Sequence, residues 1–249
     1  RGFDVVVFDK RDEIGGNLHV AKKPPFKGKF EWAIDYYKSM AKKLNITMKL
    51  GKEVTAQEVL ALKPHSILVA TGSNVISIPL EGLDQVQTVQ AHDVLANDMQ
   101  FANKKVVVIG GGITGLETAL YINRQGTNQV SVVDMLPEWP VDMLDMRYQN
   151  EALLEVRHCN DQGVALFYNN KVVKFADGKL FIESTKDGEV KELPADVIVL
   201  SVGVKPNDAL WQELLASGHP SVWKAGDAIA TGKINKAVLH GSKFGYSLN

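Results

Sequence analysis

The sequence is poor in the residue on which redox and metal chemistry often depend: it contains a single cysteine, Cys159, among 249 residues. One cysteine excludes an internal disulfide, a CxxC redox pair and a metal site built from several thiolates. The 6 histidines do not replace it, because no two of them stand four residues apart as a helical metal pair requires. We therefore expect Cys159 to be an inert core residue, and we expect no metal in this chain.

The sequence also lacks an excess of charge of either sign. Its 28 basic and 29 acidic side chains give a formal net charge of −1, which offers no basic surplus for a nucleic-acid backbone. No apolar run reaches the roughly 18 residues of a membrane span, and no basic and then apolar segment opens the chain. We expect a cytoplasmic protein that binds neither nucleic acid nor a membrane. The chain does not open with methionine either, and we expect it to be a piece of a longer protein.

Short apolar runs alternate with amphipathic stretches, a pattern typical of an α/β fold with largely parallel sheets. Strands are expected at 5–8, 66–70, 106–109, 131–133, 164–168 and 196–200, and helices at 31–44, about 113–125 and 142–161. The strand at 5–8 is expected to be buried. Asp-Gly pairs at 177–178 and 187–188 indicate hairpin turns, so that residues 171–193 form a small antiparallel meander.

A weak internal duplication runs through the chain. An apolar strand ends in an aspartate twice, at Asp9 and Asp134, and a later strand ends in a glycine twice, at Gly72 and Gly203. A glycine-rich loop precedes Asp134, and at the same offset its counterpart would fall before residue 1. The pattern predicts two Rossmann-like domains, the first of which lacks its initial strand, loop and helix.

The glycine-rich loop has the pattern G-x-G-x-x-G, with Gly110, Gly112 and Gly115 as its glycines and Ile113 and Thr114 between the last two. The pattern alone is weak evidence, but here an apolar strand precedes it and a helix-compatible run follows. In a dinucleotide-binding loop the first glycine permits the tight turn and the second lets the backbone approach a pyrophosphate. The third lets the helix pack closely on the strand, and the helix N-terminus faces the phosphates. The alternative is a plain strand–loop–helix turn without a ligand.

Asp134 follows Gly115 by 19 residues, which is the distance at which an acidic residue accepts hydrogen bonds from an adenosine ribose. A carboxylate at this position would repel a 2′-phosphate, and the neighbouring Met135 offers no arginine in compensation. We therefore predict that the chain prefers NADH to NADPH.

Two other aspartates follow short apolar runs. Asp9 is the same kind of acceptor as Asp134 and is followed by Gly15 and Gly16. Near the end of the chain, Gly226 and Asp227 precede a stretch with a helical pattern. Asp227 is suited either to bonding a polyol or to capping that helix, and for this residue taken alone capping is the simpler interpretation.

Taken together, these features resemble the flavoproteins that have two dinucleotide-binding domains. The matching motifs, in order, are Asp9 with Gly15-Gly16, Thr71-Gly72, residues 110–115 with Glu117, residues 203–207, and Gly226-Asp227. The stretches 49–73 and 110–119 are similar to the C-terminal half of the NADH:flavin oxidoreductases related to old yellow enzyme. That group includes 2,4-dienoyl-CoA reductase, enoate reductases and trimethylamine dehydrogenase. Two departures stand out: the family's first glycine loop is missing, and Asp9 replaces the more usual glutamate.

The resemblance implies an NAD-binding domain at 101–206 inserted into an FAD-binding domain formed by 1–100 and 207–249. NADH would bind on residues 110–115 and Asp134, with its nicotinamide in the crevice between the domains near Glu117. Hydride would pass from the nicotinamide to flavin N5, and the cofactors carry this chemistry. Thr71-Gly72 and Gly203 would approach the ligands, and Asp227 would contact the flavin ribityl chain. No side chain is assigned as catalytic.

The resemblance also implies partners outside this chain. In the family, electrons continue through a 4Fe-4S cluster to FMN in an N-terminal barrel domain, which reduces or oxidises a substrate such as an enoate, a dienoyl-CoA or an amine. That barrel, on the same polypeptide, is one implied partner. Separately from the resemblance, loss of a central first strand would leave two strand edges unpaired, which the protein would offset by forming a homodimer, by swapping a strand or by partial disorder of the first domain.

Two alternatives remain open. A pyridine-nucleotide disulfide reductase shares both domains but requires a dithiol, which a single cysteine does not provide. An NAD-binding module without catalysis fits a chain that lacks the loop for the FAD pyrophosphate. The colour of the protein discriminates: FAD absorbance supports the flavoenzyme, whereas a colourless protein that binds NADH supports the module.

Overall fold

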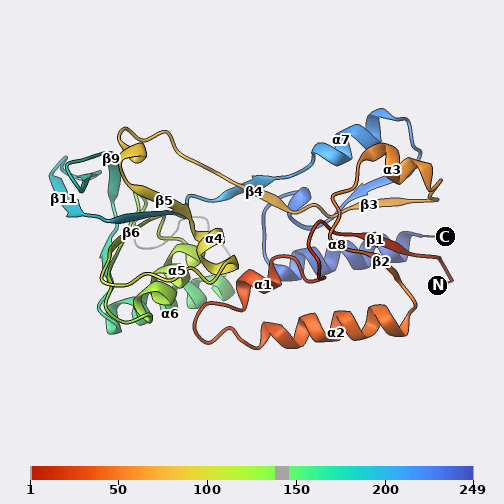
Figure 1. The fold of residues 1–249 in the computed structure, drawn as a ribbon, viewed down its shortest axis with the longest axis horizontal. Helices are drawn as coiled ribbons and strands as arrows, with labels where there is room; N and C mark the ends of the chain where they lie inside the picture. Colours follow the sequence, from red (N-terminus) through yellow and green to blue (C-terminus); the bar gives the residue numbers. More distant parts are fainter. Residues whose placement is uncertain (1, 138–145, 249) are drawn as a thin grey trace. The chain divides into compact units, whose positions relative to one another are not determined.

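The computed structural model describes residues 2–137 and 146–248, which form two compact units. Unit 1 comprises residues 1–16, 35–76 and 203–249, and unit 2 comprises residues 17–34 and 77–202. The chain therefore leaves unit 1 twice and returns to it twice, which can be followed along the sequence colours of Figure 1. Unit 2 includes two segments from the range 1–100, namely 17–34 and 77–100. The assignment of FAD and NAD to separate domains stays a prediction.

Unit 2 is built on a five-stranded parallel sheet in the order β5–β12–β6–β7–β8. Its strands are β5 (Gln87–Gln90), β6 (Lys105–Ile109), β7 (Gln129–Val133), β8 (Ala165–Phe167) and β12 (Val197–Leu200). Its helices are α1 (Leu18–Ala21), α4 (Ala91–Ala96), α5 (Ile113–Asn123) and α6 (Met146–Asp161), with a 3-10 turn, η1, at Leu83–Gln85. Parallel strands require crossover connections, and α5 and α6, which lie side by side in Figure 1, provide two of them.

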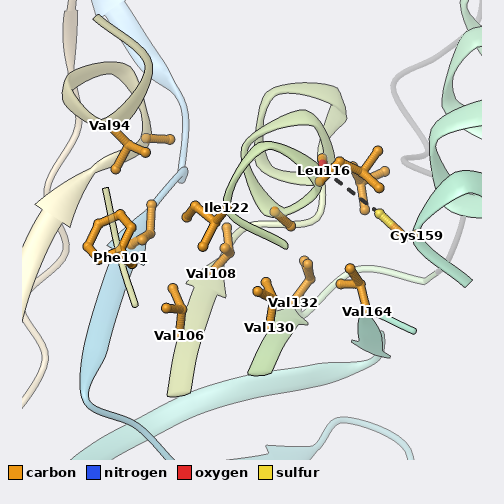
Figure 2. Close-up of a cluster of buried hydrophobic side chains, with 14 of the residues drawn as sticks. Val94, Phe101, Val106, Val108, Leu116, Ile122, Val130, Val132, Cys159 and Val164 are labelled. Carbon is orange, nitrogen blue, oxygen red and sulfur yellow. Dashed lines mark hydrogen bonds between the residues drawn. The ribbon is translucent and has the colours of Figure 1, made fainter. Parts of the chain in front are cut away.

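The core of unit 2 lies on both faces of this sheet. Alternate side chains of a strand point to opposite faces, so Val106 and Val108 of β6 pack on one face with Leu116 of α5 (Figure 2). Val107 and Ile109 point to the other face and belong to a second cluster, which includes residues of the meander. The sheet is thus covered by helices on one side and by the meander on the other.

The meander consists of β9 (Asn170–Ala176), β10 (Lys179–Ser184) and β11 (Val190–Pro194), paired antiparallel in the order β11–β10–β9. At its first turn Asp177 and Gly178 have φ angles of 51° and 73°, the conformation that favours Asp-Gly in a tight hairpin. The predicted α/β class, with parallel strands and a small meander, is confirmed. Residues 142–145 of the predicted helix lie outside the described residues.

Unit 1 contains three two-stranded pairs. They are β1 (Val6–Phe8) with β2 (Thr47–Lys49) and β3 (Ile67–Val69) with β14 (Val222–Lys224), both parallel, and β4 (Ser73–Val75) with β13 (Val204–Pro206), antiparallel. Its helices are α3 (Ala56–Ala61), α7 (Ala209–Ala216) and α8 (Ile234–Ser247), with a 3-10 turn, η2, at Gly226–Ala228; α2 (Phe30–Lys43) begins in unit 2 and continues into unit 1. None of the described helices has the length and apolarity that crossing a membrane requires.

The prediction of a buried strand at 5–8 is wrong. Val5 and Val6 are 43% and 41% exposed. Within the part of the chain that the structure describes, β1 is hydrogen-bonded to β2 alone, so its second edge and these valines stay accessible. An apolar run predicts a strand, but its burial depends on neighbours that the run itself does not specify.

Candidate functional site

The glycine loop joins the carboxyl end of β6 to the N-terminus of α5. Gly112 is the N-cap residue of α5, and the helix begins at Ile113. Within the first turns, the Thr118 hydroxyl donates a 2.7 Å hydrogen bond to the Thr114 carbonyl. Ligands of open parallel sheets bind beyond the carboxyl ends of the strands, and the first N–H groups of a helix have no partners inside the helix. The loop therefore has the location and the free donors of an anion-binding site.

The first and third glycines of the loop are required by the fold itself. Gly110 has a φ of 112°, and a Cβ built on it would lie 2.2 Å from the Ser201 carbonyl oxygen. A Cβ on Gly115 would lie 1.9 Å from the Gly110 carbonyl oxygen. Real Cβ atoms do not approach oxygen so closely, so any side chain at either position would displace the strand, the loop or α5.

The second glycine is different. Gly112 has a φ of −68° and a ψ of 173°, which any residue can adopt. A Cβ built on Gly112 would meet no atom within 4 Å. The fold alone therefore does not require glycine at this position, and the open space in front of Gly112 is where a pyrophosphate would approach the backbone. A dinucleotide fits this loop.

Asp134 lies immediately after β7 and contacts the loop. Its Oδ2 accepts a hydrogen bond of 2.5 Å from the Gly111 amide, and its Oδ1 accepts one of 2.8 Å from the Leu136 amide. The Tyr168 ring also packs on Gly111: a Cβ on Gly111 would lie 2.9 Å from a ring carbon. The structure thus brings the predicted ribose acceptor and the predicted phosphate loop together. Gly111 and Tyr168 were not singled out from the sequence, because their roles arise from this packing.

Glu117 lies in α5 and is 9% exposed. The Lys27 ammonium nitrogen is 2.7 Å from Glu117 Oε1 and 2.6 Å from Glu151 Oε1, so one cation bridges α5 and α6. Burial by itself lowers the pKa of Lys27, but the hydrogen bonds to both carboxylates outweigh burial and raise it. Burial, and then the charge of Glu117, raise the pKa of Glu155 nearby. Lys27 was not predicted from the sequence as a partner of Glu117, because the two residues lie far apart along the chain.

In unit 1, Asp9 and the glycine pair are joined through Arg11. The Arg11 amide donates a 2.9 Å hydrogen bond to Asp9 Oδ1, and its guanidinium donates a 2.5 Å hydrogen bond to the Gly16 carbonyl. Gly15 and Gly16 have φ angles of 125° and 51°, which favour glycine. The sequence did not reveal Arg11, whose contacts depend on how this turn folds.

Thr71, Gly72 and Gly203 meet around the β4–β13 ribbon. Thr71 and Gly72 connect β3 to β4, and Gly203 precedes β13. The Thr71 hydroxyl donates a 2.5 Å hydrogen bond to the Asn207 carbonyl, and the Asn207 amide donates one of 3.0 Å to the Gly72 carbonyl. The Thr71-Gly72 connection and the segment that follows Gly203 are therefore close to one another, whereas Asp9 follows a different strand pair, β1–β2.

Asp227 lies in η2 and is held from two sides. The Gly232 amide donates a 3.0 Å hydrogen bond to its Oδ1, and the Ser73 hydroxyl donates one of 3.4 Å to its Oδ2. Helix α8 has Lys233 as its N-cap residue, so the interpretation of Asp227 as the cap of that helix is wrong. Gly226, beside it, has a φ of 60°. Ser73 is the first residue of β4, so its hydrogen bond connects Asp227 to the β4–β13 ribbon, which Thr71 and Gly72 directly precede.

Comparison with known proteins places these features in a family. The family model described as pyridine nucleotide-disulphide oxidoreductase matches residues 19–240. The bilirubin reductase of Mediterraneibacter gnavus is 33% identical over 83% of this chain and 31% of its own length. The NADH oxidase of Thermoanaerobacter brockii is 30% identical over 100% of this chain and 38% of its own length. The structure of a 2-naphthoyl-CoA reductase bound to 2-naphthoyl-CoA is 28% identical, with a TM-score of 0.89, over 100% of this chain and 37% of that one.

The chain thus spans between 31% and 38% of the length of these relatives. The resemblance to the FAD/NAD(P)-binding region of the NADH:flavin oxidoreductases is confirmed, as is the predicted Rossmann-like fold. The loop, the aspartate that contacts it and the match over residues 19–240 agree: this chain belongs to the pyridine nucleotide-disulphide oxidoreductase family.

Proposed function

We propose that this chain binds NADH on residues 110–115 and passes its hydride to a flavin, as part of a longer oxidoreductase. The observation that carries the proposal is the open space at Gly112, a glycine that the fold does not require, beside the Asp134 carboxylate. The family supports oxidoreductase chemistry with FAD and a pyridine nucleotide in general. The preference for NADH over NADPH rests on Asp134 and the adjacent Met135.

In this proposal the protein binds and orients the dinucleotide. The N–H groups at the start of α5 bind the pyrophosphate, and Asp134 accepts hydrogen bonds from the adenosine ribose. Two lone pairs on each carboxylate oxygen let Asp134 do so while it keeps its bonds to Gly111 and Leu136. Lys27 orients the Glu117 carboxylate, which lies four residues or one turn beyond Ile113 in α5. When bound, NADH would supply the hydride and a flavin would be its acceptor.

The residues of this chain provide contacts for only part of an FAD molecule. Asp9 is available for its ribose, and Asp227, with Thr71-Gly72 and Gly203 nearby, for its ribityl chain. The sequence holds one G-x-G-x-x-G, at Gly110, so it offers no second loop for the FAD pyrophosphate. We therefore assign FAD binding to the longer polypeptide, together with FMN, the 4Fe-4S cluster and the barrel domain. A small substrate such as an enoate, a dienoyl-CoA or an amine would be reduced or oxidised there.

A second candidate function is an NAD-binding module without catalysis of its own. The observation that favours it is the exposed strand β1, whose valines are accessible in unit 1. A disulfide reductase is less well supported, because the single cysteine is buried and a dithiol reaction requires two.

Titration of the purified chain with NADH and NADPH, followed by nucleotide fluorescence, tests the proposal. We expect NADH to bind at least tenfold more tightly than NADPH, and an absorbance spectrum shows whether FAD copurifies. A chain that binds NADH but neither holds FAD nor takes it up supports the isolated module. A chain that binds neither nucleotide contradicts both functions.

A further inference from the structure

Helix α8 presents one face to the turn that carries Asp227. A Cβ built on Gly226 of that turn would lie 3.4 Å from the Ala237 Cβ. Three residues further along α8, the His240 ring accepts a 3.2 Å hydrogen bond at Nδ1 from the Gly226 amide. Four residues beyond that, the Phe244 ring meets Trp223 edge-on at a centroid distance of 6.1 Å. Residues spaced by three and four share one helix face, so Ala237, His240 and Phe244 define a docking face of α8.

The hydrogen bond fixes the chemical state of His240. A backbone N–H can only donate, so Nδ1 must be unprotonated and the ring proton must be on Nε2. The hydrogen bond also bears on the backbone of the turn, because it is made by Gly226, whose φ of 60° lies in the left-handed region. The Gly226 amide is adjacent to Asp227, whose carboxylate is held on its other sides by Gly232 and Ser73.

We propose that His240 is a positioning residue, which holds the turn Gly226–Ala228 through its neutral Nδ1 so that the Asp227 carboxylate keeps a fixed direction. This inference rests on the proposed function in one respect, namely that Asp227 contacts the flavin ribityl chain. His240 acts through the Gly226 backbone. Its side chain has no role in the hydride transfer itself.

The first test needs no flavin. In the full-length chain labelled with 15N, a long-range 1H–15N spectrum of the histidine rings identifies the tautomer of His240. We expect a neutral ring protonated on Nε2, and slow hydrogen exchange at the Gly226 amide. A ring protonated on Nδ1 at neutral pH, or a Gly226 amide that exchanges as fast as an unstructured one, overturns the proposal.

Substitutions separate the hydrogen bond from the bulk of the ring. The Asn side-chain oxygen stands as many bonds from the backbone as Nδ1 does, so His240→Asn keeps an acceptor in place. His240→Gln moves the acceptor one bond further out, and His240→Leu removes it. We expect exchange at Gly226 to accelerate at least tenfold in His240→Leu and His240→Gln and to stay within threefold of wild type in His240→Asn. Lys243→Gln, an exposed position on the same helix, is the matched control and is expected to leave Gly226 unchanged.

If His240→Leu fails to fold, the comparison between the Asn and Gln variants decides, since rescue by Asn alone requires the acceptor at the Nδ1 position. Equal exchange in all variants overturns the proposal. FAD titration provides the link to function: where wild type binds FAD, the dissociation constant is expected to rise about three- to tenfold in His240→Leu, the effect of one neutral hydrogen bond. If wild type does not bind FAD, the isolated NAD-binding module is supported for this chain, whereas the exchange data still test His240.

Discussion

The Gly111 amide donates a 2.5 Å hydrogen bond to Oδ2 of Asp134, and this bond ties the end of β7 to the loop at the end of β6. The sequence predicts the loop and the aspartate as two separate recognition elements. In the structure the two are in direct contact, because the carboxylate that we predict to bind a ribose also accepts a hydrogen bond from the loop that we predict to bind the phosphates. Changes at Asp134 are therefore expected to affect both.

Asp134→Asn preserves the size of the side chain but removes its charge and one of its acceptor atoms. We expect the dissociation constant for NADH to rise about tenfold, the effect of losing a charge-assisted hydrogen bond. The constant for NADPH is expected to change less, because the repulsion of its 2′-phosphate is lost as well. Titrations with both nucleotides measure the ratio. A wild-type protein that prefers NADPH tenfold, or a ratio that Asp134→Asn leaves unchanged, contradicts the assignment of Asp134.

Gly115→Ala places a Cβ against the Gly110 carbonyl oxygen, at a distance of 1.9 Å before any adjustment. We expect the free energy of unfolding to fall by about 1–3 kcal/mol, as for other overpacked positions. Urea unfolding measures this loss. Gly28→Ala is the matched control: a Cβ at Gly28 meets no atom within 4 Å, so its unfolding is expected to stay within about 0.5 kcal/mol of wild type. Equal free energies of unfolding for the two variants would contradict the close packing of α5 on the loop.

Lys27→Met removes the cation between Glu117 and Glu151 and leaves two partly buried carboxylates facing each other. We expect the free energy of unfolding to fall by about 1–3 kcal/mol, less than for a fully buried pair because the Lys27 side chain is 19% exposed. Adding Glu151→Gln is expected to recover part of the loss. Lys29→Met, at an exposed lysine of the same segment, serves as control. If both lysine variants unfold like wild type, the bridge does not stabilise the fold.

Cys159 is expected to be unreactive in the native protein. Burial, and then the charge of Glu155, raise the pKa of its thiol to about 12, and the thiol contacts the Leu116 carbonyl at 3.8 Å (Figure 2). Since the thiolate is the reactive form, Ellman's reagent at pH 8 should modify Cys159 only after the protein is unfolded in guanidinium. Stoichiometric modification of the native protein within minutes would disagree with this burial.

Much of unit 2 follows from its sequence because local signals and packing agree there. The valine runs of β6 and β7 predict buried parallel strands, and Val106 and Val108 are about 1% and 0% exposed. The glycine loop is predicted for the same reason, because its G-x-G-x-x-G pattern lies entirely within residues 110–115. By contrast, Lys27 and His240 could not be assigned, because their partners lie elsewhere in the chain and no local pattern marks the pairing. The partners of Arg11 are close in sequence, but its contacts depend on how the turn folds.

Helix α2 shows a second limit of the sequence. The helical spacing of this segment predicts one apolar face, made of Ala33, Tyr37, Met40, Ala41 and Leu44. Ala41 is buried, but Tyr37 and Leu44 are 42% and 60% exposed, and Ile34, outside that face, is fully buried. Helical periodicity gives the spacing of an apolar stripe, but the side that is covered depends on which elements pack against it. The exposed strand β1 has the same cause.

We propose that a dinucleotide binds in the space in front of Gly112, and the substitution Gly112→Asp is the sharpest test of this proposal. Asp is a good N-cap residue and its charge favours the N-terminus of α5, so the free energy of unfolding should stay equal to wild type or rise. Its carboxylate would project into the space for the pyrophosphate and repel it. The measurement is the NADH dissociation constant of the folded variant, which we expect to be at least thirtyfold weaker than that of wild type. A folded Gly112→Asp variant that binds NADH as tightly as wild type would contradict dinucleotide binding at Gly112.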